Sequence, residues 1–178
     1  MEFQGNDRSQ NRRVYKTYGS DYFTDFEQQI DFNIEMIEAG HITDRSIIDL
    51  WSLSEYEDRY EEANSIKLSV KQVGIRPDRF NLVFQQRTNE ENTFSYHQID
   101  YLSTGKTYYA IISRKDSLCQ LQIYSEPERK NIILDTGLLM GDNSMYSFLL
   151  LTRSKEEFGN LWASSSGYVE NLREKTQP

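Results

Sequence analysis

The sequence predicts an α+β domain: an antiparallel sheet or partly open barrel of about seven strands, with an N-terminal helical segment and a closing C-terminal amphipathic helix. Two observations carry this prediction. Residues 147–153 (SFLLLTR) read as a strand that runs into a capping box, in which Ser154 is followed three residues later by Glu157. From Ile66 onward, polar and apolar residues alternate with the period of two that is typical of strands.

Both predicted helices rest on a capping box followed by apolar residues at helical spacing. The C-terminal helix would carry one apolar face, made of Phe158, Leu161, Trp162, Tyr168, Val169 and Leu172. Near the N-terminus, Thr24 and Glu27 form another capping box, and an apolar stripe ends at Gly40, a residue suited to a C-terminal cap. That stripe consists of Phe26, Ile30, Ile34 and Ile37.

The remaining N-terminal part divides into three segments. Residues 1–12 are polar and without period, which predicts a disordered arm, and residues 13–178 are expected to form a single domain. Residues 13–18 alternate well enough for a first strand. Residues 43–63 are interpreted as mostly helical, although their crowded apolar part fits a short strand equally well.

Seven alternating segments predict antiparallel strands joined by readable turns. The strands are expected at 66–72, 80–86, 93–102, 107–113, 118–125, 131–135 and 146–152. The turns are expected at 76–79, 88–92, 103–106 and 141–144. Pro127 could instead begin a short helix that runs to Met140, so residues 126–140 stay open between helix and strand.

Composition narrows the classes of function. The net charge of −8 opposes nonspecific attraction to nucleic acid or anionic lipid. No stretch approaches the roughly 20 apolar residues of a membrane span, and the N-terminus lacks a secretory apolar core. The single cysteine, Cys119, lies in an alternating segment and is expected to be a buried strand residue without chemistry. We therefore expect a cytoplasmic protein with no nucleic-acid partner and no membrane span.

No catalytic residue, metal site or cofactor is predicted. His41 follows Gly40 and suits a helix end, whereas His97 suits a sheet surface, and neither has the neighbours of a triad or a metal site. The acidic cluster in residues 55–62 lacks the pattern of a calcium loop, and the glycines match no phosphate-binding loop. The pairs Arg114-Lys115 and Arg129-Lys130 fit solubilising turn charges or contacts to a phosphate group.

The order of strand, helix, antiparallel strands and C-terminal helix resembles the phosphotyrosine-binding (PTB) branch of the pleckstrin-homology-like (PH-like) superfold. Three passages are similar to that family: residues 26–42 to its early helix, 67–75 (KLSVKQVGI) to a strand that leads into a Gly-Ile turn, and 105–112 (GKTYYAII) to a later core strand. The resemblance implies an intracellular adaptor that binds a short peptide by strand addition beside the C-terminal helix.

The resemblance also implies the peptide-binding residues. The receiving edge would be the strand 96–102, and the helix would contribute three apolar side chains, which gives the set Tyr96, Gln98, Ile99, Tyr101, Leu102, Phe158, Leu161 and Trp162. Because that strand has no arginine to hold a phosphotyrosine, an unphosphorylated motif is the expected partner.

Two other functions stay open at this point. Abundant tyrosine and a terminal helix also fit a lipocalin-like barrel that binds a small apolar or aromatic ligand. A structural subunit whose aromatic face is covered in an oligomer is the third possibility, and the oligomeric state is unknown. We favour a protein that is not an enzyme, but any two of the 28 acidic residues could meet in an active site, so the question stays open.

Overall fold

The computed structural model describes residues 2–5, 13–18, 23–39, 46–55, 64–73, 76–88, 93–140, 146, 148–154 and 163–176. Every regular element within these ranges is a β-strand. The strands are β1 (Glu2–Gly5), β2 (Arg13–Thr17), β3 (Phe26–Ala39), β4 (Ser46–Ser54), β5 (Ser65–Val73), β6 (Arg76–Thr88), β7 (Thr93–Ser103), β8 (Thr107–Lys115), β9 (Leu118–Tyr124), β10 (Ile132–Asp135), β11 (Leu139–Met140), β12 (Phe148–Ser154) and β13 (Ala163–Thr176).

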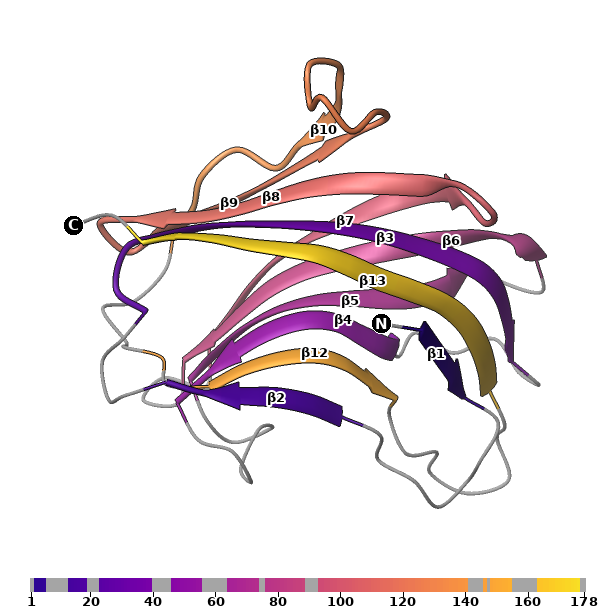
Figure 1. The fold of residues 1–178 in the computed structure, drawn as a ribbon, viewed down its shortest axis with the longest axis horizontal. Coiled ribbons are helices and arrows are strands. Elements are labelled where there is room, and N and C mark those ends of the chain that lie inside the picture. Colours follow the sequence, from indigo (N-terminus) through magenta and orange to yellow (C-terminus); the bar gives the residue numbers. More distant parts are fainter. Residues whose placement is uncertain are drawn as a thin grey trace.

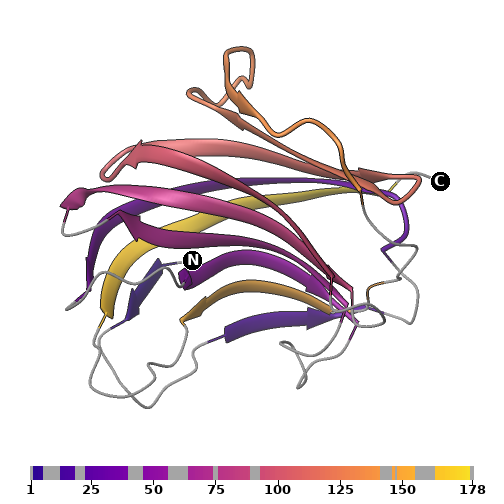
Figure 2. The same ribbon diagram turned by 180° about the vertical axis from the view of Figure 1, so that it is seen from behind.

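The strands form two antiparallel sheets. The seven-stranded sheet has the order β1-β13-β3-β8-β9-β10, with β11 also paired to β9, and the six-stranded sheet has the order β2-β12-β4-β5-β6-β7. In Figure 1, β3 and β13 pass in front of β5 and β6, and Figure 2 shows the same two layers from behind. Because the chain crosses between the sheets from β2 to β3, from β3 to β4 and from β12 to β13, the architecture is a jelly-roll-like β-sandwich.

The core lies between the sheets and is filled by alternate residues of each strand. Phe26, Ile30 and Phe32 point inward from β3 and are buried, as are Trp51 and Leu68 from the opposite sheet. One polar residue takes an inward position in this row: the Gln28 Oε1 accepts a hydrogen bond from the Trp51 Nε1 at 2.6 Å. A buried polar group is tolerated where it is hydrogen-bonded, so this bond allows a glutamine inside the sandwich.

The predicted α+β class is wrong, and the N-terminal helix over residues 24–40 is strand β3. Residues Phe26, Ile30 and Ile34 fit a helical stripe and a strand face alike, since spacings of four satisfy both periods. Gln28 hid the strand alternation, because its burial depends on Trp51, which lies 23 residues away. Pairing with β8 and β13 therefore overrides the local helical preference of the segment.

The closing C-terminal helix is also wrong over its described part, because residues 163–176 form β13. The register of β13 against β3 shifts between Ser166 and Gly167 and again between Glu170 and Arg173. A bulge of this kind interrupts the period of two and leaves apolar residues at spacings of three to four, which imitates a helix. Residues 155–162, which include Phe158, Leu161 and Trp162, lie outside the described residues.

The middle of the chain gives mixed outcomes. The helical interpretation of 43–63 is wrong for 46–54, where the alternative of a strand is confirmed as β4. All seven predicted strands are confirmed within a few residues of their ends. The open segment 126–140 contains β10 and β11, and the turn at 103–106 is confirmed at Thr104 and Gly105. The turn predicted at 76–79 is instead the start of β6, and residues 89–92 and 141–144 of two other predicted turns lie outside the described residues.

The N-terminal residues add a strand to the seven-stranded sheet. Residues 2–5 of the predicted arm form β1, which pairs with β13, while residues 6–12 lie outside the described residues.

The two sheets have separate strand orders, so the lipocalin-like closed barrel is wrong. The described part of the chain contains no helix of the length and apolarity needed to cross a membrane.

Candidate functional site

The outer face of the seven-stranded sheet carries a network of polar and aromatic side chains. Cross-strand register places its side chains in rows, because directly opposed residues of an antiparallel pair point to the same face. The central row runs Glu170, Asp31, Tyr109, Tyr124 and Ile132, and the next row runs Arg173, Gln29, Ile111, Gln122 and Asp135. We call this surface the outer face.

Asp31 is the centre of this network. The Arg129 guanidinium, from the segment before β10, forms an ion pair with the Asp31 carboxylate on β3 and lies 5.6 Å from the centre of the Tyr109 ring. The side chains of Arg129 and Asp31 are only 13% and 8% exposed, although they lie on the outward side of the sheet. The arginine thus reaches across β9 and β8 to β3, covers a tyrosine on the way and neutralises a nearly buried carboxylate.

The second oxygen of Asp31 is held from the opposite side. The Asn171 Nδ2 donates to the Asp31 Oδ2 at 2.7 Å, and Asn171 lies in the bulge of β13 with a φ of 55°. Arg129 also has a left-handed backbone, with a φ of 52°. Bulges re-aim side chains, and left-handed residues other than glycine cluster at functional sites. Both residues that bind this carboxylate are therefore placed by unusual backbone geometry.

A hydroxyl pair lies next to the carboxylate network. The phenol of Tyr168 on β13 and the hydroxyl of Thr107 on β8 are 2.7 Å apart and hydrogen-bonded. Asn33 on β3 lies between them in the register, and its Oδ1 is buried without a hydrogen-bond partner. The buried amide oxygen is thus an acceptor that the protein itself leaves unused.

Amide groups lie at the other end of the rows. The Nε2 atoms of Gln120 and Gln122 donate to the two carboxylate oxygens of Asp135, at 2.7 and 2.9 Å. These bonds, led by the one from Gln122, lower the pKa of Asp135. The carboxylate therefore stays ionised at neutral pH and fixes the two amide planes on the surface.

The segment that carries Arg129 is ordered by a single carboxylate. The Glu126 Oε1 accepts from the backbone nitrogens of Asn131 and Lys130, at 2.5 and 2.8 Å, and its Oε2 accepts from the Ser125 hydroxyl at 2.7 Å. These bonds, foremost the one from Asn131, lower the pKa of Glu126 to about 2. In Figure 1 this segment stands at the top of the molecule, beyond β8 and β9.

The two central tyrosines carry neutral hydroxyls at neutral pH. Burial raises the pKa of the phenols of Tyr109 and Tyr124 further above the ordinary value of 10.0. The Tyr124 phenol donates to the Gln122 Oε1 at 3.1 Å. The outer face therefore presents neutral hydroxyl and amide groups between charged ones, which suits a ligand that is rich in both donors and acceptors.

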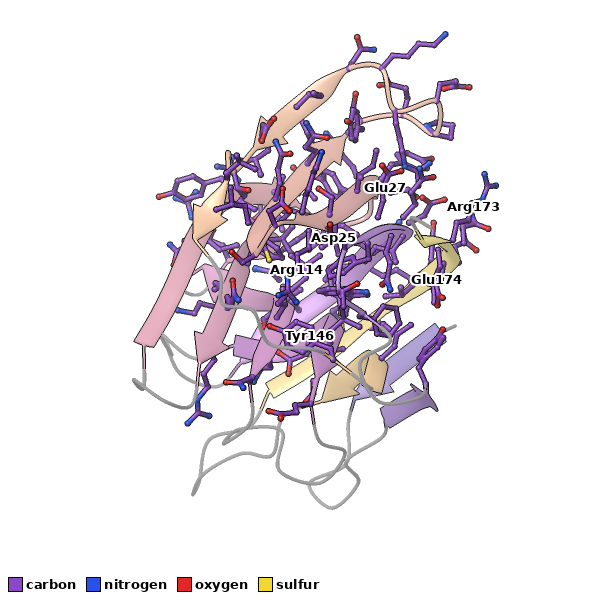
Figure 3. The ribbon with its side chains drawn as sticks, turned by 90° about the vertical axis from the view of Figure 1, so that its left-hand side faces the viewer. Asp25, Glu27, Arg114, Tyr146, Arg173 and Glu174 are labelled. Carbon is purple, nitrogen blue, oxygen red and sulfur yellow. The ribbon has the colours of Figure 1, made fainter. Side chains whose placement is uncertain are left out.

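A second cluster lies at one end of the sandwich, where β3 begins and β13 ends (Figure 3). Arg114 of β8 points into the core and its guanidinium lies 5.3 Å from the centre of the Tyr146 ring. Figure 3 shows these two side chains together, with Asp25 beside them and Arg173 and Glu174 farther out. Because Arg114 is buried, this cluster closes the end of the core, and we assign the candidate site to the outer face.

No protein-family model and no curated protein matches this sequence. Solved structures do match. The alginate lyase from Klebsiella pneumoniae has a TM-score of 0.60 at 7% identity, covering 86% of this chain and 60% of the lyase, and the PL7 alginate lyase from Zobellia galactanivorans has 0.56 at 10%, covering 98% and 76%. A carbohydrate-binding module from Bacillus subtilis has 0.50 at 12%, covering 97% and 86%.

The likeness is one of fold. At these identities it establishes the β-sandwich alone. The chain spans 60% of the length of the Klebsiella lyase. These matches, together with the absence of helices from the described residues, show that the resemblance to PTB and PH-like domains is wrong, and with it the peptide-binding adaptor that the resemblance implied.

The residues predicted for peptide binding are not gathered into a groove by the described structure. Tyr96, Gln98, Ile99, Tyr101 and Leu102 all lie on β7, which is an edge strand of the six-stranded sheet. Ile99 is buried in the core, Gln98 is exposed on the opposite side, and Tyr101 is 60% exposed. The three predicted helix residues lie outside the described residues, as noted above.

Sequence reasoning missed the residues of the outer face almost entirely. The pattern predicts a turn charge or a phosphate contact for Arg129, and the structure places its guanidinium on Asp31. The alternating segment 118–124 did contain a usable signal, because Gln120, Gln122 and Tyr124 are its outward residues. Asp31 and Asn171 carried no signal, since they are 140 residues apart and meet only through the register of β3 and β13.

Proposed function

We propose that this protein binds carbohydrate on the outer face of its seven-stranded sheet. The single observation that carries the proposal is the row arrangement of tyrosine hydroxyls and fixed amide groups across β3, β8 and β9. A sugar presents many hydroxyl groups, and each can donate and accept, so it matches a surface on which both kinds of partner alternate. Most polar groups of a sugar that become buried on binding would have a hydrogen-bond partner on this face.

The solved structures of similar fold support this proposal from a separate direction. The two lyases are alginate lyases, and the module from Bacillus subtilis is a carbohydrate-binding module. Because one fold hosts many functions, these names raise the expectation for carbohydrate without naming a site. The outer face is the site that we propose, and the names of these similar structures support carbohydrate as the class of ligand.

The test is an affinity measurement against a panel of soluble polysaccharides, for the wild type and two matched variants. Gln122→Ala removes an amide from the outer face, whereas Gln98→Ala removes an exposed glutamine from β7 of the other sheet. We expect binding of at least one polymer, with a loss of about tenfold for Gln122→Ala, as for one or two hydrogen bonds, and little change for Gln98→Ala.

Two outcomes would overturn the proposal. One is the absence of binding to every polymer in the panel. The other is an equal loss in both variants while circular dichroism shows that both are folded, because the outer face would then have no special role.

A further inference from the structure

The outer face carries more negative than positive charges. Among the described side chains of the strands and of Arg129, the outward carboxylates outnumber the outward cations: Glu27, Asp31, Glu35, Asp135 and Glu170 stand against Lys115, Arg129 and Arg173. Figure 3 shows that Glu27 and Arg173 share one end of the sandwich. The face is therefore acidic as a whole, in agreement with the chain's net charge of −8.

The only described cation over the central row is already neutralised. The guanidinium of Arg129 is ion-paired with Asp31 and stacked over Tyr109, and it is mostly shielded from solvent. Its Nε is buried and has no hydrogen-bond partner among the described residues. The charge of the guanidinium is cancelled by the carboxylate beside it.

The neighbouring carboxylates keep their negative charge near neutral pH, because they are not protonated there. The Glu126 pKa is lowered to about 2 by its three hydrogen bonds, and the pKa of Asp135 is lowered by its two glutamines. Both acids therefore keep their negative charge wherever the protein would meet a ligand. A carboxylate or sulfate group that approached the central row would be surrounded by charges of its own sign.

We propose that the ligand of the outer face is an uncharged polysaccharide, and that Asp31 is the residue that excludes acidic ones, because it cancels the charge of Arg129. This inference rests on the proposed function and adds the class of sugar to it. Arg129 then gives the outer face no net attraction for anions, because its charge is already matched by Asp31.

The effect of Asp31 is large enough to measure. A unit charge acts on another about 6 Å away with roughly 1 to 3 kcal/mol at the effective dielectric of a protein surface, which corresponds to about tenfold in affinity or more. Salt screens such an interaction, because the Debye length is about 10 Å at 0.1 M ionic strength. Charge preference and salt dependence are therefore two independent readouts of the same property.

The experiment compares one polymer in two charge states. The best neutral binder of the panel is oxidised at its primary hydroxyls to carboxylates, so that the backbone of the polymer stays the same. Wild type, Asp31→Asn and Glu170→Gln are titrated with both forms, at low and at high salt. Glu170 is exposed and lies opposite Asp31 in the register, so its amide variant removes a charge without disturbing the ion pair.

We expect the wild type to bind the neutral form at least about tenfold more tightly than the oxidised form, with little dependence on salt. Asp31→Asn should narrow that ratio by about tenfold, and Glu170→Gln should narrow it by less, since its charge is in contact with water. If Asp31→Asn fails to fold, the salt dependence of the wild type and the ratio for Glu170→Gln still test the preference of the outer face for the uncharged polymer.

Failure of this inference is distinct from failure of the proposed function. If no polymer binds in either form, carbohydrate binding itself is wrong. If a polymer binds but the oxidised form binds more tightly, or if binding weakens steeply with salt, the face recognises acidic sugars and Asp31 does not exclude them.

Discussion

The outer surfaces of the two sheets differ in how their polar side chains are arranged. On the seven-stranded sheet, long polar side chains rise from the strands and find partners on other elements, as Asp31 does with Arg129 and Asn171. On β4 and β5 of the six-stranded sheet, the residues that point away from the core are mostly short and buried, namely Asp49, Ser52, Ser54, Ser65, Lys67 and Ser69. The alternation of side chains along a strand therefore determines which of them point away from the core. It does not determine how deeply those side chains are buried.

The hydrogen bonds of the two surfaces differ accordingly. The Asp49 Oδ1 accepts from the Ser69 hydroxyl at 2.5 Å within the six-stranded sheet, whereas the hydroxyls of Ser52 and Ser65 have no partner. An unpaired buried hydroxyl costs free energy, and a paired one roughly repays its desolvation. Networks of long, hydrogen-bonded polar side chains thus characterise the outer face of the seven-stranded sheet. Substitutions on each surface can test this difference.

The largest effect is expected for Asp31→Ala. Removal of the carboxylate leaves the shielded Arg129 charge without its partner, and a loss of about 2 to 3 kcal/mol in the free energy of unfolding should follow. The matched control is Asp78→Ala, because the pair of Asp78 with Arg79 is well exposed, at 68% and 43%, and should contribute less than about 1 kcal/mol. Chemical denaturation of both variants makes the comparison, and equal losses would mean that the Arg129 pair is no better shielded than a surface pair.

A somewhat smaller loss is expected on the six-stranded sheet for Asp49→Ala. The substitution removes the acceptor of the Ser69 hydroxyl in a buried position, which should lower the free energy of unfolding by about 2 kcal/mol. Asp49→Asn keeps an oxygen acceptor and should recover part of the loss. If the asparagine variant is as unstable as the alanine variant, the charge of Asp49 rather than its bond to Ser69 is what the fold needs.

Ser52→Ala should have the opposite sign. Its hydroxyl is buried without a partner, so alanine removes an unmet desolvation cost and should stabilise the protein by up to about 1 kcal/mol. Ser69→Ala is the matched control, because that hydroxyl donates to Asp49 and its removal should destabilise. Thermal unfolding of the two variants would show midpoints that move in opposite directions, and movement in the same direction would contradict the assignment of Ser52.

The sequence predicted most strands of the six-stranded sheet but only β8, β9 and β10 of the seven-stranded sheet, and it failed where strand alternation depends on distant residues. From Ile66 to Asp135 the period of two is nearly unbroken, so local reasoning sufficed there. In β3 the inward Gln28 breaks the apolar pattern, and only its bond to Trp51 makes it an inward residue. In β4 the register shifts between Asp49 and Trp51, which crowds apolar residues and imitates a helix.

The outer face was beyond prediction for a related reason. Asp31 and Arg129 are 98 residues apart, and their pairing requires the order β3-β8-β9-β10, which no local pattern contains. The chemistry of each residue was visible in the sequence, but the topology that assembles them was not. A correct prediction of β3 as a strand would have placed Asp31 and Asn33 on one surface and so supplied the first half of the site.

The smallest effect is a local one and depends on pH. The folded pKa of Glu126, about 2, lies below its ordinary value of 4.5, so its bonds to Asn131, Ser125 and Lys130 stabilise the segment fully above pH 4.5. That contribution declines as the pH falls from 4.5 through 2, because the protonated carboxyl is a weaker acceptor. Hydrogen exchange at the amides of Asn131 and Lys130 should therefore accelerate in this window, after correction for the intrinsic rate, relative to amides of β5.

Glu126→Gln should remove that pH dependence and leave the same amides less protected at neutral pH, while the exposed Glu128→Gln should leave them unchanged. Since these bonds order only the segment before β10, the melting temperature of the whole protein should move little in either variant. Loss of protection in β5 within the same window would mean that acid opens the sandwich as a unit and that the two surfaces are not independent. Unchanged exchange at Asn131 would instead mean that the segment is held by the ion pair between Arg129 and Asp31 alone.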